Sequence, residues 1–264
     1  MTDNITNLKN IYQTQGWVIV KNFFTKQSVN KIKKQILTKA KKSRSNDHLY
    51  FEKIGNKKKL RRIEKVSDFS KISKNMIYSK KIFSLIKKIK NKEFGLFKDK
   101  LNFKYPGGKG YLPHIDGHFL WKDKYNKQQN GWKKYSDDFI NLVIPIEKTN
   151  RTNGCIYLAN INDTKKLGNS FNKISKKMVL GTPNIKNKDK KKFSFTPIEL
   201  NEGDICFFDW KCAHFSKNND STKSRMIFYA TYYNKKNKKN VRNSYYLDKL
   251  TSLNDKKNKS LLFS

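Results

Sequence analysis

Residues 101–121 read LNFKYPGGKGYLPHIDGHFLW and place His114 and Asp116 two positions apart. A second histidine, His214, follows 98 positions after Asp116, and Arg225 comes eleven positions later. Two imidazoles and one carboxylate can hold one face of a ferrous ion and leave its other coordination positions open. A cation just beyond the second histidine could anchor an acidic co-substrate. His114, Asp116 and His214 therefore predict the ligand set of a mononuclear iron oxygenase, with Arg225 as the anchor of its co-substrate.

The backbone around His114 and Asp116 favours one metal geometry over another. Glycines precede the pair, and Pro113 and Gly117 flank it, so we expect an extended or turning segment. In an extended segment, residues two apart project to one side, which lets both side chains reach one metal. The competing pair, His114 and His118, would need a helix with an internal glutamate, and this segment offers neither. We expect His118 to lie beside the site or the substrate at most.

His214 and Arg225 belong to residues 203–225, GDICFFDWKCAHFSKNNDSTKSR. His214 ends an apolar run, where a strand would hold a ligand rigidly. Cys212 leaves open a zinc site made of His and Cys, although no CxxC pair supports one. Burial of the strand face that carries Arg225 would be costly unless a carboxylate meets the guanidinium, and a dicarboxylic co-substrate would supply that partner. The alternatives are an arginine in solvent or one paired with Asp220.

The composition predicts one domain. The chain has 264 residues, 36% of them hydrophobic, which is enough for one substantial core. We expect a single domain over residues 1–264, with a helical part at about 1–93 and a β core at about 94–233. No run approaches the roughly 20 apolar residues of a membrane span, and the N-terminus lacks the apolar core of a signal peptide. Three cysteines are too few, and odd in number, for a disulfide framework, so we expect a cytoplasmic protein.

The pattern along the chain predicts helices followed by strands. Residues 16–24, GWVIVKNFF, are typical of a strand, and Thr25 offers an N-cap to an amphipathic helix. A second helix is expected near 79–92, whereas the polar segments 41–63 and 234–243 are expected to form a loop and a connection or tail. Other runs favour strands, namely 94–105, 139–146, 155–158, 205–210 and 226–233. The predicted architecture is a β-sandwich or barrel with helices packed on its outside.

The net charge of +38 would attract phosphates, but it does not by itself indicate a nucleic-acid partner. Only six of the 59 basic residues are arginine, which is the residue favoured for bidentate contacts to phosphate and guanine. The chain is also crowded with Asn, Ile, Tyr and Phe, which favours a drift of composition as the explanation. We expect a solvated, lysine-covered surface, with attraction to anionic partners as the alternative.

Four segments of the chain stand out together: residues 12–32 (YQTQGWVIVKNFFTKQSVNKI), residues 101–121, Asn153-Gly154-Cys155 and residues 203–225. In the last segment a serine, an asparagine and an arginine follow His214 at two, four and eleven positions. In this order the segments resemble the phytanoyl-CoA dioxygenase family of iron(II)- and 2-oxoglutarate-dependent oxygenases. The likeness runs from about residue 12 to residue 233.

The resemblance implies a mainly β protein with flanking helices, an α+β fold whose core is a double-stranded β-helix of the jelly-roll or cupin type. It implies that iron(II) is held by the catalytic triad His114, Asp116 and His214, and that Arg225 pairs with the far carboxylate of 2-oxoglutarate. The other residues expected near the co-substrate are Ser216, Trp132, Lys104 and Asn102. The implied reaction uses O2, converts 2-oxoglutarate to succinate and carbon dioxide, and hydroxylates a C–H bond of a small-molecule metabolite. Because Asp116 is present, halogenation is disfavoured.

The identity of the substrate and the oligomeric state stay open. Phe215 replaces the glycine of the family's usual His-Gly-Ser, and Asn160-Ile161-Asn162 stands where many members have Pro-Gly-Ser-His. The lysines would suit an anionic metabolite such as a phosphonate, a phosphorylated sugar or a coenzyme A thioester. Two other functions remain as alternatives. One is oxidative demethylation of nucleic acid, whose second arginine is replaced here by Thr231, and the other is a non-catalytic binding module on the same fold.

Overall fold

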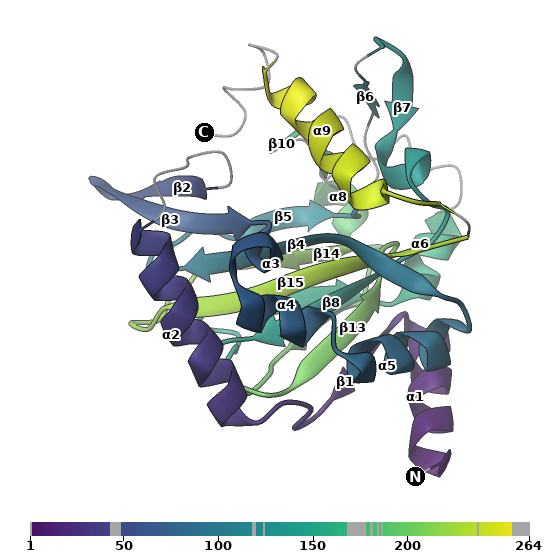
Figure 1. Ribbon diagram of the computed structural model, residues 1–264, viewed down its shortest axis with the longest axis horizontal. Coiled ribbons are helices and arrows are strands. Elements are labelled where there is room, and N and C mark those ends of the chain that lie inside the picture. Colours follow the sequence, from purple (N-terminus) through teal and green to yellow (C-terminus); the bar gives the residue numbers. More distant parts are fainter. Residues whose placement is uncertain are drawn as a thin grey trace.

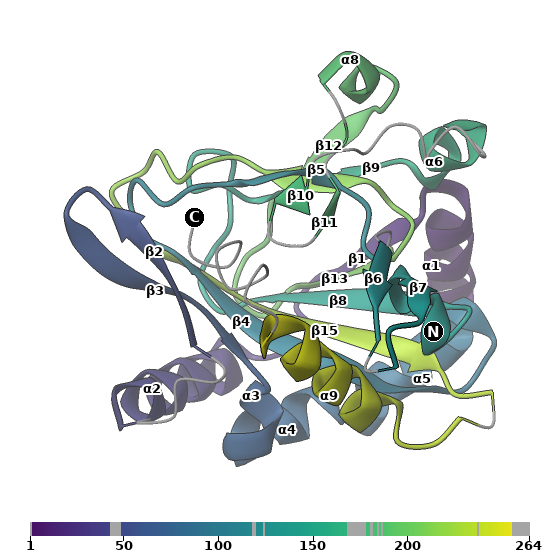
Figure 2. The same ribbon diagram turned by 90° about the horizontal axis from the view of Figure 1, so that it is seen from above.

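Two antiparallel β-sheets face each other, and helices cover the outer side of the larger sheet (Figures 1 and 2). The computed structural model describes residues 2–42, 49–117, 120–123, 125–167, 178–179, 182–183, 185, 187–236 and 238–254. This arrangement confirms the predicted fold class, a double-stranded β-helix with flanking helices.

The larger sheet has seven strands. In spatial order they are β1 (Trp17–Val20), β13 (Ile205–Asp209), β8 (Phe139–Pro145), β15 (Arg225–Asn234), β4 (Phe94–Lys104), β3 (Lys57–Glu64) and β2 (Leu49–Ile54). The smaller sheet contains β12 (Phe195–Ile198), β9 (Ile156–Ala159), β14 (His214–Ser216) and β5 (Tyr111–His114). Two short pairs complete the strands: β6 (Leu120–Lys122) with β7 (Gln128–Asn130), and β10 (Met178–Val179) with β11 (Thr182–Pro183).

Most of the helices pack on the apolar outer face of the larger sheet. Apolar side chains of α2 (Lys26–Lys42), α3 (Val66–Phe69), α4 (Lys71–Ile77) and α5 (Lys80–Lys90) join one core cluster with the outer face of the larger sheet. Helix α1 (Thr2–Gln15) packs against α5 and β1, and α9 (Val241–Asn254) lies against β4. The remaining short helices are α6 (Ile161–Leu167), α8 (Asn187–Lys190) and the 3-10 helix η1 (Gly131–Lys134). None of the described helices has the length and apolar composition needed to span a bilayer.

Alternate residues of β15 face opposite sides of the larger sheet, as the geometry of a strand requires. Phe228, Ala230 and Tyr232 belong to the cluster that packs on the helices. Ile227 and Tyr229 instead contact the cluster between the sheets. The pairs that β15 and β4 form on this inner face are Arg225–Lys104, Ile227–Asn102, Tyr229–Lys100 and Thr231–Lys98. The inner face of β4 is therefore polar and mostly cationic.

The strand predicted at 16–24 is present but shorter, over Trp17–Val20, and the predicted helices from Thr25 and near 79–92 are confirmed. The prediction of a loop over 41–63 was wrong, because α2 runs to Lys42 and the β2–β3 hairpin follows. This hairpin lies at one edge of the sheet, so its residues before Ile63 are half-buried or exposed and do not show an apolar pattern. The prediction of a connection or tail over 234–243 was also incomplete, since α9 begins at Val241.

One buried hydrogen bond ties the helical layer to the sheet, and its loss should be measurable. The Tyr232 hydroxyl donates to Ile77 O at 2.7 Å. Tyr232→Phe should therefore lower the free energy of unfolding by about 1–3 kcal/mol, because the buried carbonyl loses its donor. Tyr78→Phe, at a residue that is 42% exposed, is the matched control and should leave stability unchanged. Equal stability of the two variants in urea unfolding would contradict this packing.

Candidate metal centre

Three side chains with metal-ligating atoms meet between the two sheets. Strand β5 ends at His114 and β14 begins at His214, and their antiparallel pairing places the two residues opposite each other. Their ring centroids are 4.2 Å apart, and His214 Nε2 lies 3.9 Å from Asp116 Oδ2. One ligand atom from each of the three residues lies within 4.8 Å of the other two. The structure thus assembles the predicted triad as one compact donor group.

Backbone carbonyls set the orientation of both imidazole rings. His114 Nδ1 lies 2.6 Å from Leu112 O, and His214 Nδ1 lies 3.0 Å from Cys212 O. Because a carbonyl oxygen only accepts, each Nδ1 carries the proton and donates it. Each Nε2 therefore keeps its lone pair, which is the one available to a metal ion.

Two further polar residues fix the carboxylate of Asp116. Asn141 Nδ2 donates to Asp116 Oδ2 at 3.1 Å, and Thr231 Oγ1 donates to Asn141 Oδ1 at 2.7 Å. Both residues are buried, and they face each other on the neighbouring strands β8 and β15. The sequence pattern did not single them out for this role. The available signal was one asparagine in FINLVIP, a strand whose other side chains are apolar and all buried.

Electrostatics hold the three groups in the protonation states that metal binding requires. Burial, with a contribution from the neighbouring His214, lowers the pKa of His114 to about 3. Burial also lowers the pKa of His214. Burial alone would raise the pKa of Asp116, but the electrostatic interactions with His214 and Lys98 outweigh it and lower that pKa to about 2. At neutral pH both imidazoles are neutral and the carboxylate is charged.

Trp132 lies beside the loop that carries Asp116. Its backbone N–H donates to Gly117 O at 3.2 Å, and its ring, in a residue that is 3% exposed, packs against Gly117 and Phe97. The backbones at Gly117 and Gly131 can come this close only because Gly131 has no side chain, since a Cβ there would lie 1.5 Å from Gly117 O. A contact between Trp132 and a co-substrate stays a prediction.

Arg225 is buried on the inner face of the larger sheet, and no carboxylate in the described part of the chain pairs with it. The residue is 1% exposed, and its Nε and Nη1 have no hydrogen-bond partner among the described residues. Tyr229, which lies further along β15 on the same face, shares a hydrogen bond with the guanidinium. The alternatives of an arginine in solvent or paired with Asp220 are therefore wrong. Asn102 Oδ1, on the neighbouring strand, is likewise buried without a partner.

Lys104 and Ser216 support each other next to Arg225. The Lys104 amine donates to Ser216 Oγ at 2.9 Å and also to the carbonyl oxygens of Gly154 and Lys217. Ser216 Oγ accepts a second bond from Tyr111 N at 3.1 Å. The hydroxyl proton of Ser216 is then left to donate to an incoming oxygen. The expected contacts of Lys104, Ser216 and Asn102 with a co-substrate stay predictions.

The alternative zinc sites gain no support. His118 lies outside the described residues. Cys212 directs its Sγ to Gly16 O at 3.4 Å and does not belong to the His-Asp-His group. Burial raises the pKa of the Cys212 thiol well above its usual range, which opposes the thiolate that zinc needs. Cys155 and Cys206 are also buried and free.

The residues fit iron(II) and 2-oxoglutarate together. Two imidazole nitrogens and one carboxylate oxygen are the donor set of a facial triad, which leaves coordination positions open for a chelating co-substrate and O2. A buried guanidinium with donors that no described residue uses can pair with a carboxylate. A dicarboxylate that reaches from the triad to Arg225 would satisfy both ends.

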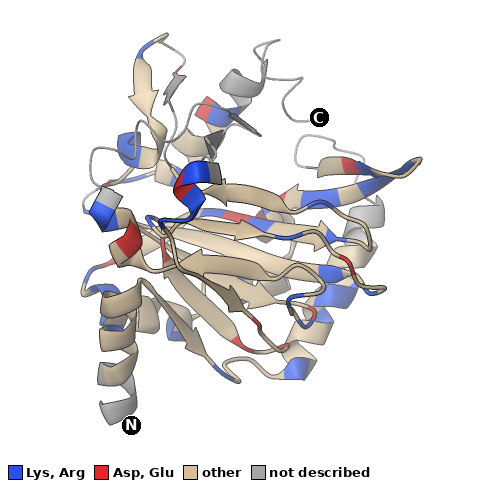
Figure 3. Cartoon of the chain, turned by 180° about the vertical axis from the view of Figure 1, so that it is seen from behind, with Lys and Arg blue, Asp and Glu red and all other residues tan. Residues whose placement is uncertain are grey.

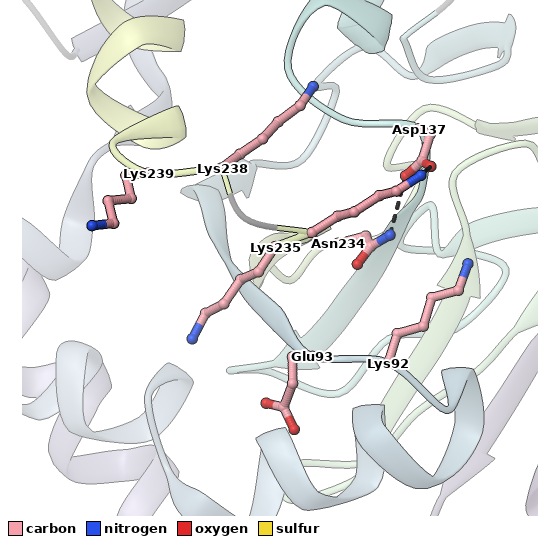
Figure 4. Close-up of a pocket in the computed structure, with 8 residues that line it drawn as sticks. Lys92, Glu93, Asp137, Asn234, Lys235, Lys238 and Lys239 are labelled. Carbon is pink, nitrogen blue, oxygen red and sulfur yellow. Dashed lines mark hydrogen bonds and ion pairs between the residues drawn. The ribbon is translucent and has the colours of Figure 1, made fainter.

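A separate groove of about 670 Å³ lies on the surface and is not the metal centre. It is lined by Lys92, Glu93, Asp137, Asn234, Lys235, Lys236, Lys238 and Lys239, and none of the three candidate ligands is among them. The side chains of Lys235, Lys238 and Lys239 point away from one another rather than toward a common point (Figure 4). The groove therefore lacks a converging set of donors.

The sequence profile described as Phytanoyl-CoA dioxygenase (PhyH) matches residues 12–227. The chain belongs to this family. Among curated relatives, a 2-aminoethylphosphonate dioxygenase from the uncultured bacterium HF130_AEPn_1 is 27% identical over 247 residues, which cover 91% of this chain and 86% of the relative. The dioxygenase lolE1 from Epichloe uncinata is 23% identical and covers 76% and 70% of the two chains. A methylphosphonate hydroxylase from Gimesia maris is 25% identical and covers 60% and 52%.

A solved structure supports the fold of the family. EctD from S. alaskensis, with 2-oxoglutarate and 5-hydroxyectoine, superposes with a TM-score of 0.65 at 12% identity. The match covers 86% of this chain and 75% of that one. At this identity the similarity concerns the double-stranded β-helix itself.

The lowered histidine pKa values predict how the stability of the metal-free protein depends on pH. In the unfolded chain a histidine has a pKa of about 6.5, whereas that of folded His114 is about 3. Protons therefore favour the unfolded state, and the contribution of His114, complete above pH 6.5, is lost as the pH falls toward 3. The free energy of unfolding should drop by up to about 1.4 kcal/mol per pH unit in this window. His114→Gln should flatten the slope between pH 6.5 and 5, and an unchanged slope would contradict this.

Proposed function

We propose that this protein is an iron(II)- and 2-oxoglutarate-dependent dioxygenase that hydroxylates a C–H bond of a small anionic molecule. One observation carries the proposal: a compact His-Asp-His group and a buried arginine with no carboxylate partner among the described residues both face the space between the two sheets. Membership of the phytanoyl-CoA dioxygenase family supports the reaction class.

In this proposal His114, Asp116 and His214 hold the iron through two Nε2 atoms and a carboxylate oxygen. When bound there, the iron supplies the chemistry with O2 that converts 2-oxoglutarate to succinate and carbon dioxide and oxidises the substrate. The chain keeps the ligands in place. The carbonyls of Leu112 and Cys212 hold the imidazole protons on Nδ1, away from the centre.

The remaining residues orient the carboxylates. The Thr231–Asn141 pair fixes the Asp116 carboxylate, which would then be presented to the metal in one orientation. Arg225 would take the far carboxylate of 2-oxoglutarate in a bidentate pair, and the Ser216 hydroxyl would donate to the same carboxylate. Because these partners stand on strands of a rigid scaffold, the co-substrate would be held in a single pose.

Asp116 supports hydroxylation over halogenation. A halogenating centre of this family leaves the carboxylate position to a small residue so that a halide can coordinate. Here the carboxylate is present and charged, and Asn141 orients it. Transfer of an oxygen atom to the substrate carbon is then the expected outcome.

The relatives favour a small, anionic substrate. Two of the three named above are a 2-aminoethylphosphonate dioxygenase and a methylphosphonate hydroxylase. The alternative of nucleic-acid demethylation has less support, because Lys and Arg are scattered over helices, strand ends and loops (Figure 3). Thr231, which stands where that class has a second arginine, is used to orient Asn141. A non-catalytic binding module is disfavoured because the donor group is complete.

We further propose that the chain works as one domain in the cytoplasm. Strands from both sides of residue 93 share the larger sheet, which supports a single folding unit. The three cysteines are buried thiols, which suits a reducing compartment.

Replacement of Arg225 should separate co-substrate binding from metal binding. With iron(II) supplied anaerobically and O2 then added, the wild type should release succinate from 2-oxoglutarate. Arg225→Met should raise the KM for 2-oxoglutarate by about 100-fold, because a charged hydrogen-bonded pair is lost, while the affinity for iron(II) is retained. Arg151→Met, at an exposed arginine, is the control. Absence of succinate above the iron-only background in the wild type would refute the proposed function.

Asn141→Leu tests the orientation of Asp116. Removal of the amide leaves the carboxylate without its fixed partner, so the affinity for iron(II) should fall by about 10- to 100-fold. The matched control is Asn30→Leu on an exposed position of α2, and both are compared by anaerobic titration with iron(II). Equal affinities in Asn141→Leu and the wild type would show that the Asn141 contact does not serve the metal.

A further inference from the structure

Two lysines stand on the inner face of β4 next to the metal centre. Lys98 is paired in register with Thr231, whose side chain is linked through Asn141 to Asp116. Lys100 is paired with Tyr229, and its Nζ lies 5.4 Å from the centroid of that ring. Both amines are close enough to Asp116 to help lower the pKa of its carboxyl group. The two lysines therefore point into the same space as the triad.

The position of Lys98 is fixed by Trp132. The Lys98 Nζ lies 3.8 Å from the centroid of the Trp132 ring, and that ring packs on Gly117 beside Asp116. A cation over an indole face is held without its charge being neutralised. The amine can thus stay in place beside the metal centre and still accept an anion.

Neither amine has an acidic partner in the described part of the chain. Glu64 stands beside Lys100 in register, but its carboxylate is already paired with Lys249 and Arg62. The surrounding charges keep Glu64 ionised, and its pKa is far below the usual range although burial opposes this. Asp116 is committed to the metal in the proposed function. Among the described residues, no carboxylate is left for Lys98 and Lys100.

Such an arrangement is costly unless something else supplies a negative charge. Burial lowers the pKa of Lys98 to about 7, with Lys100 adding to the effect. Burial also lowers the pKa of Lys100. Two like charges two residues apart on one strand face repel each other, and a lysine that served only stability would extend to solvent or meet an acid. The positions and charges of Lys98 and Lys100 therefore suit the binding of an anion.

We propose that Lys98 and Lys100 bind the anionic group of the primary substrate, and that this group is a phosphonate or phosphate on a small molecule. The inference rests on the proposed function, because it assigns the substrate of the same site. A tetrahedral dianion offers three oxygens, which two separate ammonium groups can share. Arg225 remains for 2-oxoglutarate toward the start of β15, whereas Lys98 and Lys100 are paired with later positions of that strand. Substrate and co-substrate then have different cations.

Calorimetric titration with defined anions tests the assignment. The probes are methylphosphonate, methyl phosphate and uncharged dimethyl methylphosphonate, added to the full chain both metal-free and loaded anaerobically with iron(II) and 2-oxoglutarate. We expect one or both anions to bind and the neutral ester not to bind. Lys98→Met and Lys100→Met should each raise the Kd of the anion by about tenfold or more, the loss of one charge-assisted contact. Tighter binding of methylphosphonate would indicate a phosphonate substrate, and tighter binding of methyl phosphate would indicate a phosphate. Equal binding would support a site that accepts either group.

Two controls keep the result specific. Both lysine variants should bind 2-oxoglutarate within about twofold of the wild type, which also shows that they are folded, whereas Arg225→Met should lose 2-oxoglutarate and keep the anion. Lys235→Met, in the surface groove, should change neither affinity. Anion binding by the Lys98→Met/Lys100→Met double variant within twofold of the wild type would overturn the assignment, as would a wild type that binds neither anion. Failure to bind iron or release succinate would instead refute the proposed function, and the metal-free titration would still decide the role of the lysines.

Discussion

The antiparallel pairing of β5 with β14 is the contact on which the site depends. It sets His114 opposite His214, and the two backbones then turn both Nε2 atoms toward one point. The pairing needs an unusually close approach at its start, where a Cβ on Gly110 would lie 2.0 Å from Ser216 O. Gly110 is therefore needed for the pairing that places the two histidines, because a side chain at this position would force the strands apart.

The second feature of the site is the row of lysines on the inner face of β4, which lies between the two sheets. Strand β4 directs Leu101 and Phe103 to the helices and directs lysines to the space between the sheets. A net charge of +38 is mostly a property of the surface. The few cations that are buried carry more chemical meaning, because each of them needs a counter-charge. Some of these cations have a counter-charge within the chain, as Arg62 has in Glu64. In our proposal the others receive it from ligands.

Residue type and spacing were sufficient to predict the fold class and the meeting of His114, Asp116 and His214, whereas the roles of these residues and of Arg225 stay predictions. His114 and Asp116 are neighbours in sequence, and His214 and Arg225 lie at the two ends of one polar turn, so local pattern carries the information. The supporting residues depend on register between distant strands. Asn141 meets Thr231 across β8 and β15, and nothing in either strand alone shows which residues will be opposite.

Lys98 and Lys100 illustrate a different limit. Alternating lysines on a strand are typical of a face in solvent, but β4 directs these two into the space between the sheets, where Trp132 packs against Lys98. Helix α9 begins after the residues that match the family, yet its Lys249 neutralises Glu64 beside Lys100. The charge balance of the site thus depends on a segment that the family resemblance does not cover.

The most direct test of this account is a crystal structure of the protein prepared anaerobically with iron(II) and 2-oxoglutarate. The account predicts one iron bound by Nε2 of His114, Nε2 of His214 and a carboxylate oxygen of Asp116, with the far carboxylate of 2-oxoglutarate paired with the guanidinium of Arg225. Iron at any other set of residues, or a 2-oxoglutarate that leaves Arg225 unpaired, would contradict it.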